Sequence, residues 1–420
     1  MKFVHAADIH LDSPLRGLER YEGAPVERIR RATRDALENL VALCLEEQAE
    51  LLLIAGDLYD GNWRDYGTGL YFVSQMARLR AGGTQVVLLR GNHDAASQIT
   101  RSLPLPSFVK ELDPRRPETC VFEGFGVAVH GQSFATKAVT QDLAAGYPQA
   151  LPSLLNIGLL HTSAGGREGH ENYAPCSLST LESKGYEYWA LGHVHQREIL
   201  REDPWVIFSG NLQGRHARET GAKGATLVTV DGGRITAVEH RALDVVRWCV
   251  CELDVSRAAS SDDVIDLVRA ALERATIDAD GRAVAARVVI SGASPAHASL
   301  QRDPEQVINA IRAVANDVGS GEVWVEKVSI GTRITNDFAE IAARDDAIGQ
   351  LARQLRALRT DDQGLRALAE DLSELRVKLP LELHQGEDAI HLDDLDFLRT
   401  MLDDVEQILV PRLLAREENR

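Results

Sequence analysis

The sequence lacks the features that mark secreted, membrane-spanning and disulfide-bonded proteins. Its five cysteines are odd in number and show no pattern of paired metal ligands, which favours reduced thiols. No apolar run approaches the roughly 18 residues that a membrane span needs. The first residues also lack the basic and long apolar regions of a signal peptide. We therefore expect a cytoplasmic protein without a membrane segment.

Positive charge is also scarce. The 420 residues include 46 Lys and Arg against 63 Asp and Glu, which gives a net charge of −17. Residues 338–420 contribute −8 of this, because they hold 11 basic and 19 acidic residues. The balance argues against a broad basic surface that coats nucleic acid or an anionic membrane, but it does not exclude a local phosphate-binding site.

Over about the first 240 residues, short apolar runs alternate with helical patterns. Fully apolar strands between amphipathic helices are typical of a sheet that is covered on both faces. The later runs are more closely spaced and suit added strands, some antiparallel, in a layered α/β domain. The expected strands are 2–7, 51–55, 85–89, 121–130, 155–161, 187–191, 206–209 and 225–230, and the expected helices are 26–50 and 65–80.

The pattern changes in the rest of the chain. A strand-helix-strand-helix-strand series follows at 250–255, 262–274, 284–291, 304–315 and 323–330, which is enough for a small domain. Beyond it the strand signal ends, and leucines recur at helical spacing in three stretches. The predicted domains are 1–243, 244–336 and 337–420. The last part either packs on its own domain or docks a partner helix or coiled coil, and its three apolar stripes favour the partner.

Polar residues follow the ends of several predicted strands. Ligands of open α/β sheets gather at the carboxyl ends of strands, so we expect these side chains to converge. Taken singly, each has an ordinary explanation as a turn residue or a core histidine. Their joint order favours a site for divalent metal ions, which bind carboxylate, carbonyl and imidazole groups. The residues are Asp8, His10, Asp57, Asn92, His93, Asp94, His161, His193 and His195.

In this order the motifs resemble those of the calcineurin-like metallophosphoesterases, and more closely those of the SbcD-type DNA repair nucleases and YhaO-like proteins. The series Asp-X-His, Gly-Asp-X-X-Asp, Gly-Asn-His-Asp, His and Gly-His-X-His is present in full, and residues 190–195 and 209–216 look like further signatures. The resemblance covers the chain to about residue 240. It implies an α/β fold, namely a four-layer β-sandwich flanked by helices, with a small β-α-β-α-β capping domain and a helical C-terminal tail.

The resemblance also implies a site for two metal ions. Asp57 would bridge them. The mixed nitrogen and oxygen ligands favour Mn²⁺, with Fe²⁺ or Zn²⁺ as competitors. The first ion would be completed by Asp8, His10 and His195, and the second by Asn92, His161 and His193.

Other polar residues of these motifs are candidates for catalysis or substrate binding. His93 is the candidate that protonates the leaving oxygen. Asp94 either orients His93 or caps a helix, and both roles are compatible. Arg215 and His216 follow a glycine-rich turn and are candidates for binding a substrate phosphate, or alternatively for a salt bridge with a nearby glutamate.

Asp60, the second acid of Gly-Asp-X-X-Asp, is expected to stabilise its turn rather than bind metal.

Two functions fit these residues. The first, implied by the resemblance, is a metal-dependent DNA exonuclease of double-strand break repair, working 3′→5′ with single-strand endonuclease activity. Such a nuclease would be a homodimer and would pair with an SbcC-like ATPase through the helical C-terminal region. The alternative is a stand-alone phosphodiesterase or phosphatase that acts on nucleotides or other small phosphoesters. The same two metals serve either reaction, so the walls of the site decide between them.

Overall fold

The computed structural model describes residues 1–15, 26–60, 66–96, 105–165, 173–335, 338–380, 383 and 389–418. Within these residues, none of the helices combines the length and the apolar character that crossing a membrane requires. The chain divides into two compact units. The first consists of Met1–Val250, Glu273–Arg287 and Gly319–Lys327, and the second of Cys251–Leu272, Val288–Val318 and Val328–Arg420.

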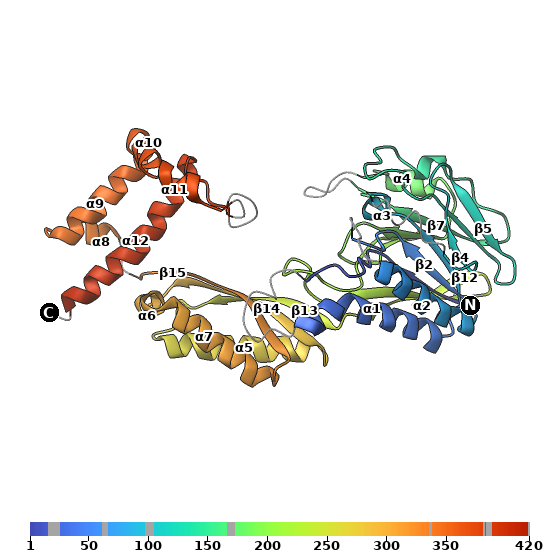
Figure 1. Ribbon diagram of the computed structural model, residues 1–420, viewed down its shortest axis with the longest axis horizontal. Helices are drawn as coiled ribbons and strands as arrows, with labels where there is room; N and C mark the ends of the chain where they lie inside the picture. The colour runs from blue at the N-terminus through green and yellow to red at the C-terminus, as the bar shows by residue number, and fades with distance from the viewer. Residues whose placement is uncertain are drawn as a thin grey trace. The chain divides into compact units, whose positions relative to one another are not determined.

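Two six-stranded sheets form the centre of the first unit (Figure 1). Both sheets have parallel strands in the middle. Antiparallel pairing occurs at one edge of the first sheet and at both edges of the second. The first sheet has the order β12 (Arg234–Ala242), β11 (Gly224–Asp231), β1 (Lys2–Ala6), β2 (Leu51–Ala55), β3 (Gln85–Leu89) and β4 (Val109–Glu111). The second has the order β5 (Glu118–Phe122), β6 (Val127–Gly131), β7 (Leu155–His161), β8 (Tyr188–Gly192), β10 (Trp205–Phe208) and β9 (Glu198–Glu202).

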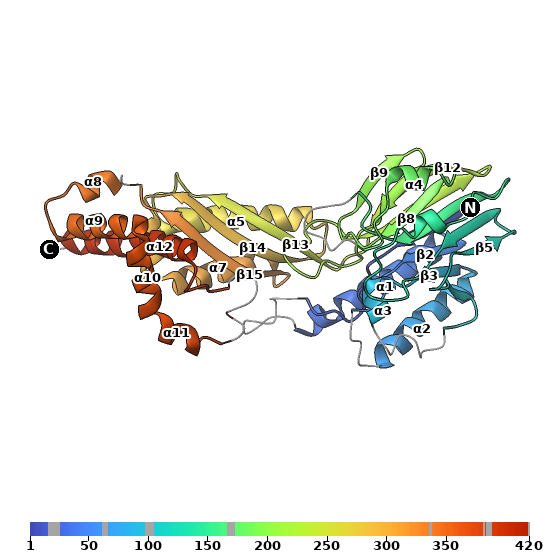
Figure 2. The same ribbon diagram turned by 90° about the horizontal axis from the view of Figure 1, so that it is seen from above.

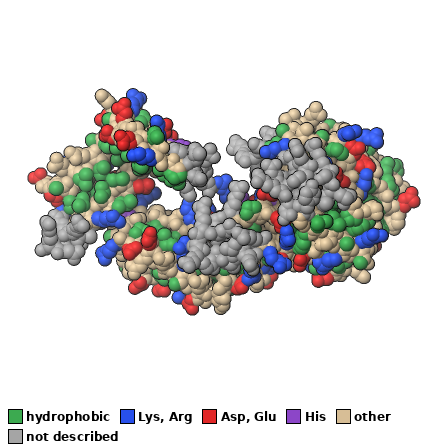
Figure 3. Space-filling model, viewed as in Figure 1, with side chains coloured by type: hydrophobic (Ala, Val, Ile, Leu, Met, Phe, Trp, Pro, Cys, Tyr) green, Lys and Arg blue, Asp and Glu red, His purple; other side chains and the backbone are tan. Residues whose placement is uncertain are grey.

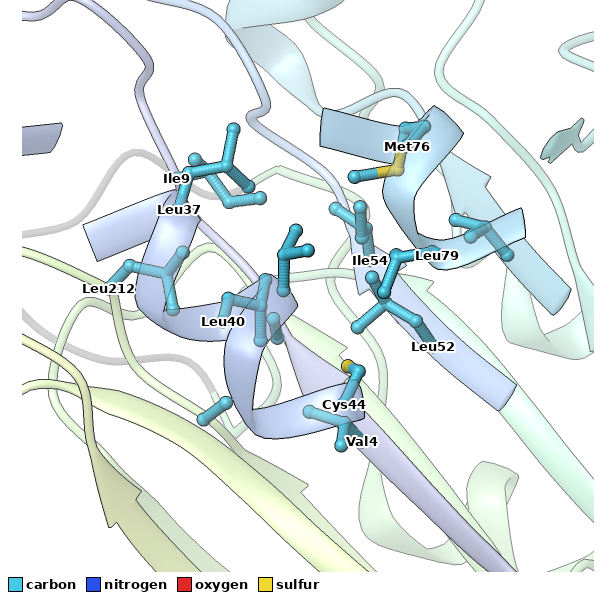
Figure 4. Packing of buried hydrophobic residues seen from close by; sticks show 14 of the residues in the cluster. Val4, Ile9, Leu37, Leu40, Cys44, Leu52, Ile54, Met76, Leu79 and Leu212 are labelled. Carbon is cyan, nitrogen blue, oxygen red and sulfur yellow. The ribbon is translucent and has the colours of Figure 1, made fainter. Parts of the chain in front are cut away.

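The sheets are layered with helices, as the sequence predicts. On one face of the first sheet, α1 (Val26–Glu46) and α2 (Tyr66–Gly82) bury an apolar cluster that includes Val4, Leu40 and Met76 (Figure 4). The opposite face packs on the second sheet through residues such as Phe3 and Ile157. The outer face of the second sheet is covered by the short α4 (Leu178–Glu182) and the 3₁₀ turn η2 (Ala144–Gly146). Because both faces of each sheet are covered, the central strands β2, β3, β7 and β8 are almost entirely buried.

A three-stranded sheet follows, with the order β13 (Val246–Asp254), β14 (Ala283–Ala293) and β15 (Val323–Arg333). Figure 2 shows its strands with the helices α5 (Ser261–Asp278) and α7 (Pro304–Gly319) beside them. A short helix, α6 (His297–Arg302), precedes α7 and is absent from the predicted series. On the face shown in Figure 3, acidic and basic side chains are interspersed.

The tail consists of helices, and their apolar stripes pack against one another. Two buried clusters hold it together, one around Ile348 and Val410 and the other around Leu365 and Leu398. Other apolar side chains of the tail are exposed, among them Val377. Internal packing therefore accounts for part of each predicted stripe. The helices are α8 (Phe338–Ala342), α9 (Ala347–Thr360), α10 (Asp362–Asp371), α11 (Ser373–Lys378) and α12 (Leu395–Glu418).

Candidate metal centre

The carboxyl ends of strands from both sheets bring the predicted residues together. The loops that follow these strands are tightly folded, because several site residues have a left-handed backbone. Their φ angles are 49° at Asp8, 44° at His10, 51° at Asp57 and 99° at His193. Backbone hydrogen bonds hold two of these loops together, from Asp8 N to Gly56 O and from His10 N to Asp57 O, both 3.0 Å long. Such a backbone is costly for residues with a Cβ, so the surrounding fold must impose it.

Two glycines let the ligand side chains approach the backbone. A Cβ on Gly91 would lie 2.2 Å from Asp57 Oδ1 and 2.8 Å from His161 Cε1. A Cβ on Gly56, where φ is +92°, would lie 2.5 Å from His161 Nδ1. The glycines of the Gly-Asp and Gly-Asn-His motifs are therefore required by the close approach of Asp57 and His161.

The first group of potential ligands is Asp8, His10 and His195, whose ligand atoms all lie within 4.8 Å of one another. The Nε2 atoms of His10 and His195 are 3.2 Å apart. Burial, aided by the charge of Arg215, lowers the pKa of His10 to about 3, so its imidazole is neutral and keeps a lone pair. The Nδ1 atom of His195 lies 2.6 Å from Glu219 Oε1 and is paired as a donor, which leaves Nε2 facing His10 as an acceptor.

The second group is Asp8, Asp57 and His161. His161 Nδ1 donates to Ala55 O at 2.9 Å, so its Nε2 carries the lone pair. That Nε2 faces Asn92 Oδ1 at 2.9 Å and Asp57 Oδ2 at 3.5 Å. Three acceptors that face one another at these distances are stabilised by a cation between them.

His193 lies beside this second group. Its ring centroid is 5.2 Å from that of His161, and its backbone N–H donates to both carboxylate oxygens of Asp8.

The two carboxylates of the centre are almost fully buried, each 1% exposed. Burial, together with the charge of Asp57, raises the pKa of Asp8 well above its ordinary value. Burial also disfavours the charged form of Asp57, but His161, His10 and His93 outweigh it, so the pKa of Asp57 is lowered. Buried like charges and neutral imidazole lone pairs directed at one region fit divalent cations with nitrogen and oxygen ligands.

His93 lies at the edge of the centre, and the structure gives it a carboxylate partner other than the predicted one. Its Nδ1 is 3.0 Å from Asp60 Oδ1, and its side chain is 37% exposed. This hydrogen bond is the main reason that the pKa of His93 is raised. Asp60 Oδ2 also accepts from Ser13 Oγ at 2.8 Å. Asp60 therefore does more than the turn stabilisation expected from the sequence, because it holds a catalytic candidate.

Of the two roles expected for Asp94, its hydrogen bonds match the helix cap. Its carboxylate accepts hydrogen bonds from the backbone N–H groups of Gly91 (3.0 Å), Leu58 (3.2 Å) and Tyr59 (3.0 Å). Burial and the nearby charge of Asp57 raise its pKa to about 7. Asp94 lies inside α3 (Asn92–Ala96) and accepts from the backbone N–H of Gly91, the residue that precedes this helix. The acid of a capping box makes the same contact. It joins the loops after β2 and β3 rather than orienting His93.

The predicted phosphate-binding residues lie at the same edge. Arg215 Nη1 is 3.3 Å from Ser13 Oγ and 3.7 Å from Asp60 Oδ2, and the side chain is 14% exposed. The alternative salt bridges are also present, because Glu219 Oε1 is 3.7 Å from Arg215 Nη2 and 3.4 Å from His216 Nε2. The contact between Glu219 and His195 is absent from the sequence-based predictions, since nothing in the sequence signals a contact made only by folding.

Comparisons with known proteins agree with this geometry. The family model for calcineurin-like phosphoesterases matches residues 1–197, and the model for the middle domain of the metallophosphoesterase YhaO matches residues 248–333. The chain is 34% identical over 299 residues to the uncharacterized metallophosphoesterase YhaO of Bacillus subtilis, covering 70% of this chain and 72% of that protein.

More distant similarities extend over parts of the chain. The DNA double-strand break repair protein Mre11 of Methanopyrus kandleri is 28% identical over 213 residues, covering 46% of this chain and 44% of that protein. A solved structure of a dimetal phosphatase from Danio rerio is 12% identical, with a TM-score of 0.38, over 58% of this chain and 96% of that chain. The family models and the Bacillus relative show that this chain belongs to the calcineurin-like metallophosphoesterases, in the family of YhaO, and is a metal-dependent hydrolase.

Proposed function

We propose that the protein is a metal-dependent phosphodiesterase that degrades DNA ends in double-strand break repair, 3′→5′ and with single-strand endonuclease activity. The observation that carries this proposal is the convergence of buried metal-ligand candidates beside an imidazole and an arginine at one edge of two sheets. The similarity to proteins named for DNA double-strand break repair supports a DNA substrate.

In this proposal the donor atoms divide between two ions, most readily Mn²⁺. When bound, such a pair of ions activates water for attack on phosphorus and offsets the charge of the transferring group. Asp57 Oδ2 lies 4.0 Å from His10 Nε2 and 3.5 Å from His161 Nε2, so this carboxylate faces one imidazole of each proposed set. Asp8, His10 and His195 hold the first ion, and Asn92, His161 and His193 hold the second.

The residues beside the metals then have distinct tasks. Because Asp60 holds the Nδ1–H of His93, the Nε2–H of the same ring is available to protonate the leaving oxygen. The raised pKa of His93 keeps this proton bound at higher pH than in an isolated imidazole. Arg215 binds a phosphate oxygen of the substrate through its guanidinium, with His216 beside it.

Purified protein tests this proposal directly. With Mn²⁺ it should degrade linear DNA from the 3′ end, and His93→Ala should abolish degradation while Mn²⁺ binding persists. His391→Ala is a matched control, since it removes an exposed imidazole from the tail. Hydrolysis of mononucleotides or chromogenic phosphoesters with no cleavage of DNA would instead establish the small-phosphoester function.

We further propose that the helical tail binds an SbcC-like ATPase. Leu375 and Val377 of α11 are 51% and 81% exposed, so they offer apolar surface that the tail itself does not bury. Leu375→Glu with Val377→Glu should abolish capture of the ATPase in a pull-down and leave hydrolysis of a small phosphodiester intact. Leu267→Glu, at an exposed leucine of α5, is the control. Undiminished capture by the double variant would contradict this binding site. The proposed homodimer is tested by sedimentation of the full chain.

A further inference from the structure

A buried glutamate lies directly behind one of the proposed ligands. Glu219 is 6% exposed. Its Oε1 is 2.6 Å from His195 Nδ1, and its Oε2 accepts from Asn211 Nδ2 at 2.9 Å and from the backbone N–H of Arg215 at 2.7 Å. Oε2 therefore holds the loop that carries the arginine. Oε1 faces His195 most closely, and it also lies 3.4 Å from His216 Nε2 and 3.7 Å from Arg215 Nη2.

His195 is held at its backbone as well. Its carbonyl oxygen accepts from Lys223 Nζ at 2.9 Å and from Asn211 N at 3.3 Å. The ring therefore cannot follow a displaced Glu219 by moving its own backbone. What Glu219 controls is the orientation of the imidazole and the nitrogen that carries its proton.

We propose that Glu219 is a positioning residue that keeps the proton of His195 on Nδ1 and thereby directs the Nε2 lone pair toward Asp8 and His10. Through Oε2 the same carboxylate fixes the backbone at Arg215, so metal binding and phosphate binding are set by one side chain. This inference rests on the proposed role of His195 as a metal ligand. Partners of this kind, behind a ligating imidazole, typically contribute 10- to 100-fold to metal affinity.

The hydrogen bonds of Glu219 predict an unusual order of metal affinity among its variants. In Glu219→Gln the single carbonyl oxygen is retained by the two N–H donors of Asn211 and Arg215. The amide NH₂ then faces His195 Nδ1 and favours the opposite tautomer, with Nε2–H directed into the metal centre. Glu219→Ala leaves the tautomer free. The isosteric glutamine should therefore weaken metal binding at least as much as alanine, whereas a role in packing alone predicts the reverse.

The test measures Mn²⁺ binding by the full chain. Calorimetry and the electron paramagnetic resonance signal of free Mn²⁺ both report the binding. We expect the wild-type protein to bind two ions and Glu219→Gln to bind one of them about 10- to 100-fold more weakly. Glu239→Gln, the same change at an exposed residue of β12, should bind like the wild type. Unchanged thermal unfolding without metal would show that the variant is folded.

Two results would overturn the inference and are distinguishable. The first result is that Glu219→Gln binds Mn²⁺ like the wild type, or that Glu219→Ala binds it more weakly than Glu219→Gln does. If His195→Ala loses an ion in the same assay, this result overturns only the positioning role of Glu219. Binding of both ions by His195→Ala overturns the ligand assignment and the inference together. Neither readout involves DNA, so failure of the proposed nuclease activity would appear separately, in the cleavage assay.

Discussion

Replacing Asp60 with asparagine should lower the rate of phosphodiester hydrolysis mainly through His93. The contact of Asp60 with His93 Nδ1, at 3.0 Å, is shorter than those with His10 Nδ1, at 3.6 Å, and Arg215 Nη1, at 3.7 Å. Asparagine can still accept the Nδ1–H of His93, but a charge-assisted hydrogen bond becomes a neutral one. Hydrogen bonds to charged groups contribute about 1.5–3 kcal/mol and neutral ones about 0.5–1.5 kcal/mol. Since the side chains of His93 and Asp60 are 37% and 28% exposed, we take the lower end of this difference, about 1 kcal/mol. That corresponds to about a fivefold loss of kcat.

A double-mutant cycle is the appropriate assay. His93→Ala should lower kcat about 10²- to 10⁴-fold, and Asp60→Asn should lower it much less in the His93→Ala background than in the wild type. The measurement is Mn²⁺-dependent hydrolysis of a chromogenic phosphodiester at saturating metal, with Asp231→Asn as a control for the lost charge at an exposed site. If Asp60→Asn lowers kcat by the same factor with and without His93, Asp60 acts elsewhere and the proton-donor reasoning is refuted.

Three further predictions concern a glycine of the centre, a buried thiol of α1 and the effect of metal on stability. Gly91→Ala should abolish Mn²⁺ binding, because the new Cβ would meet Asp57 and His161, whereas Gly124→Ala, which meets nothing within 4 Å, should bind normally in the same titration. Burial raises the pKa of Cys44 to about 12, so at pH 8 only about one thiol in ten thousand is ionised. Mass spectrometry should then find Cys44 resistant to iodoacetamide until urea unfolds the protein, and alkylation of the native protein at the unfolded rate would contradict its burial. Chelation of metal should lower the melting temperature, and Mn²⁺ at 100 times its Kd should restore about 2.7 kcal/mol; equal melting with and without metal would argue against a site that binds only the folded state.

The sequence is most informative where burial is complete. The runs 51–55, 85–89 and 155–161 are strands with the predicted bounds, because every or nearly every side chain in them is buried. The edge strand β9 and the outer strand β12 are absent from the predictions, because their alternating exposure leaves too few apolar residues. The region 121–130, expected as one run, is instead two antiparallel strands joined by a turn.

The same distinction applies to the site. The potential ligands follow strand ends, so their convergence is predictable from the order of strands and polar residues. The carboxylates behind the imidazoles are not, because Asp60 and Glu219 reach His93 and His195 only through the folded loops. Asp94 shows where prediction from sequence ends. It is the neighbour of His93 in the sequence, which suggests that the two side chains are in contact, but its carboxylate instead accepts from three backbone N–H groups.

Asp8 has a left-handed backbone and is buried beside Asp57. Both features lower the stability of the metal-free fold, whereas the carboxylate of Asp8 is needed for the proposed metal binding. In the metal-free protein, Asp8→Asn should raise the melting temperature, because it removes a buried like charge while asparagine tolerates the φ of 49°. The same variant should lose metal affinity. Selection or laboratory evolution for thermal tolerance alone would therefore remove the carboxylate, and its presence records selection for turnover.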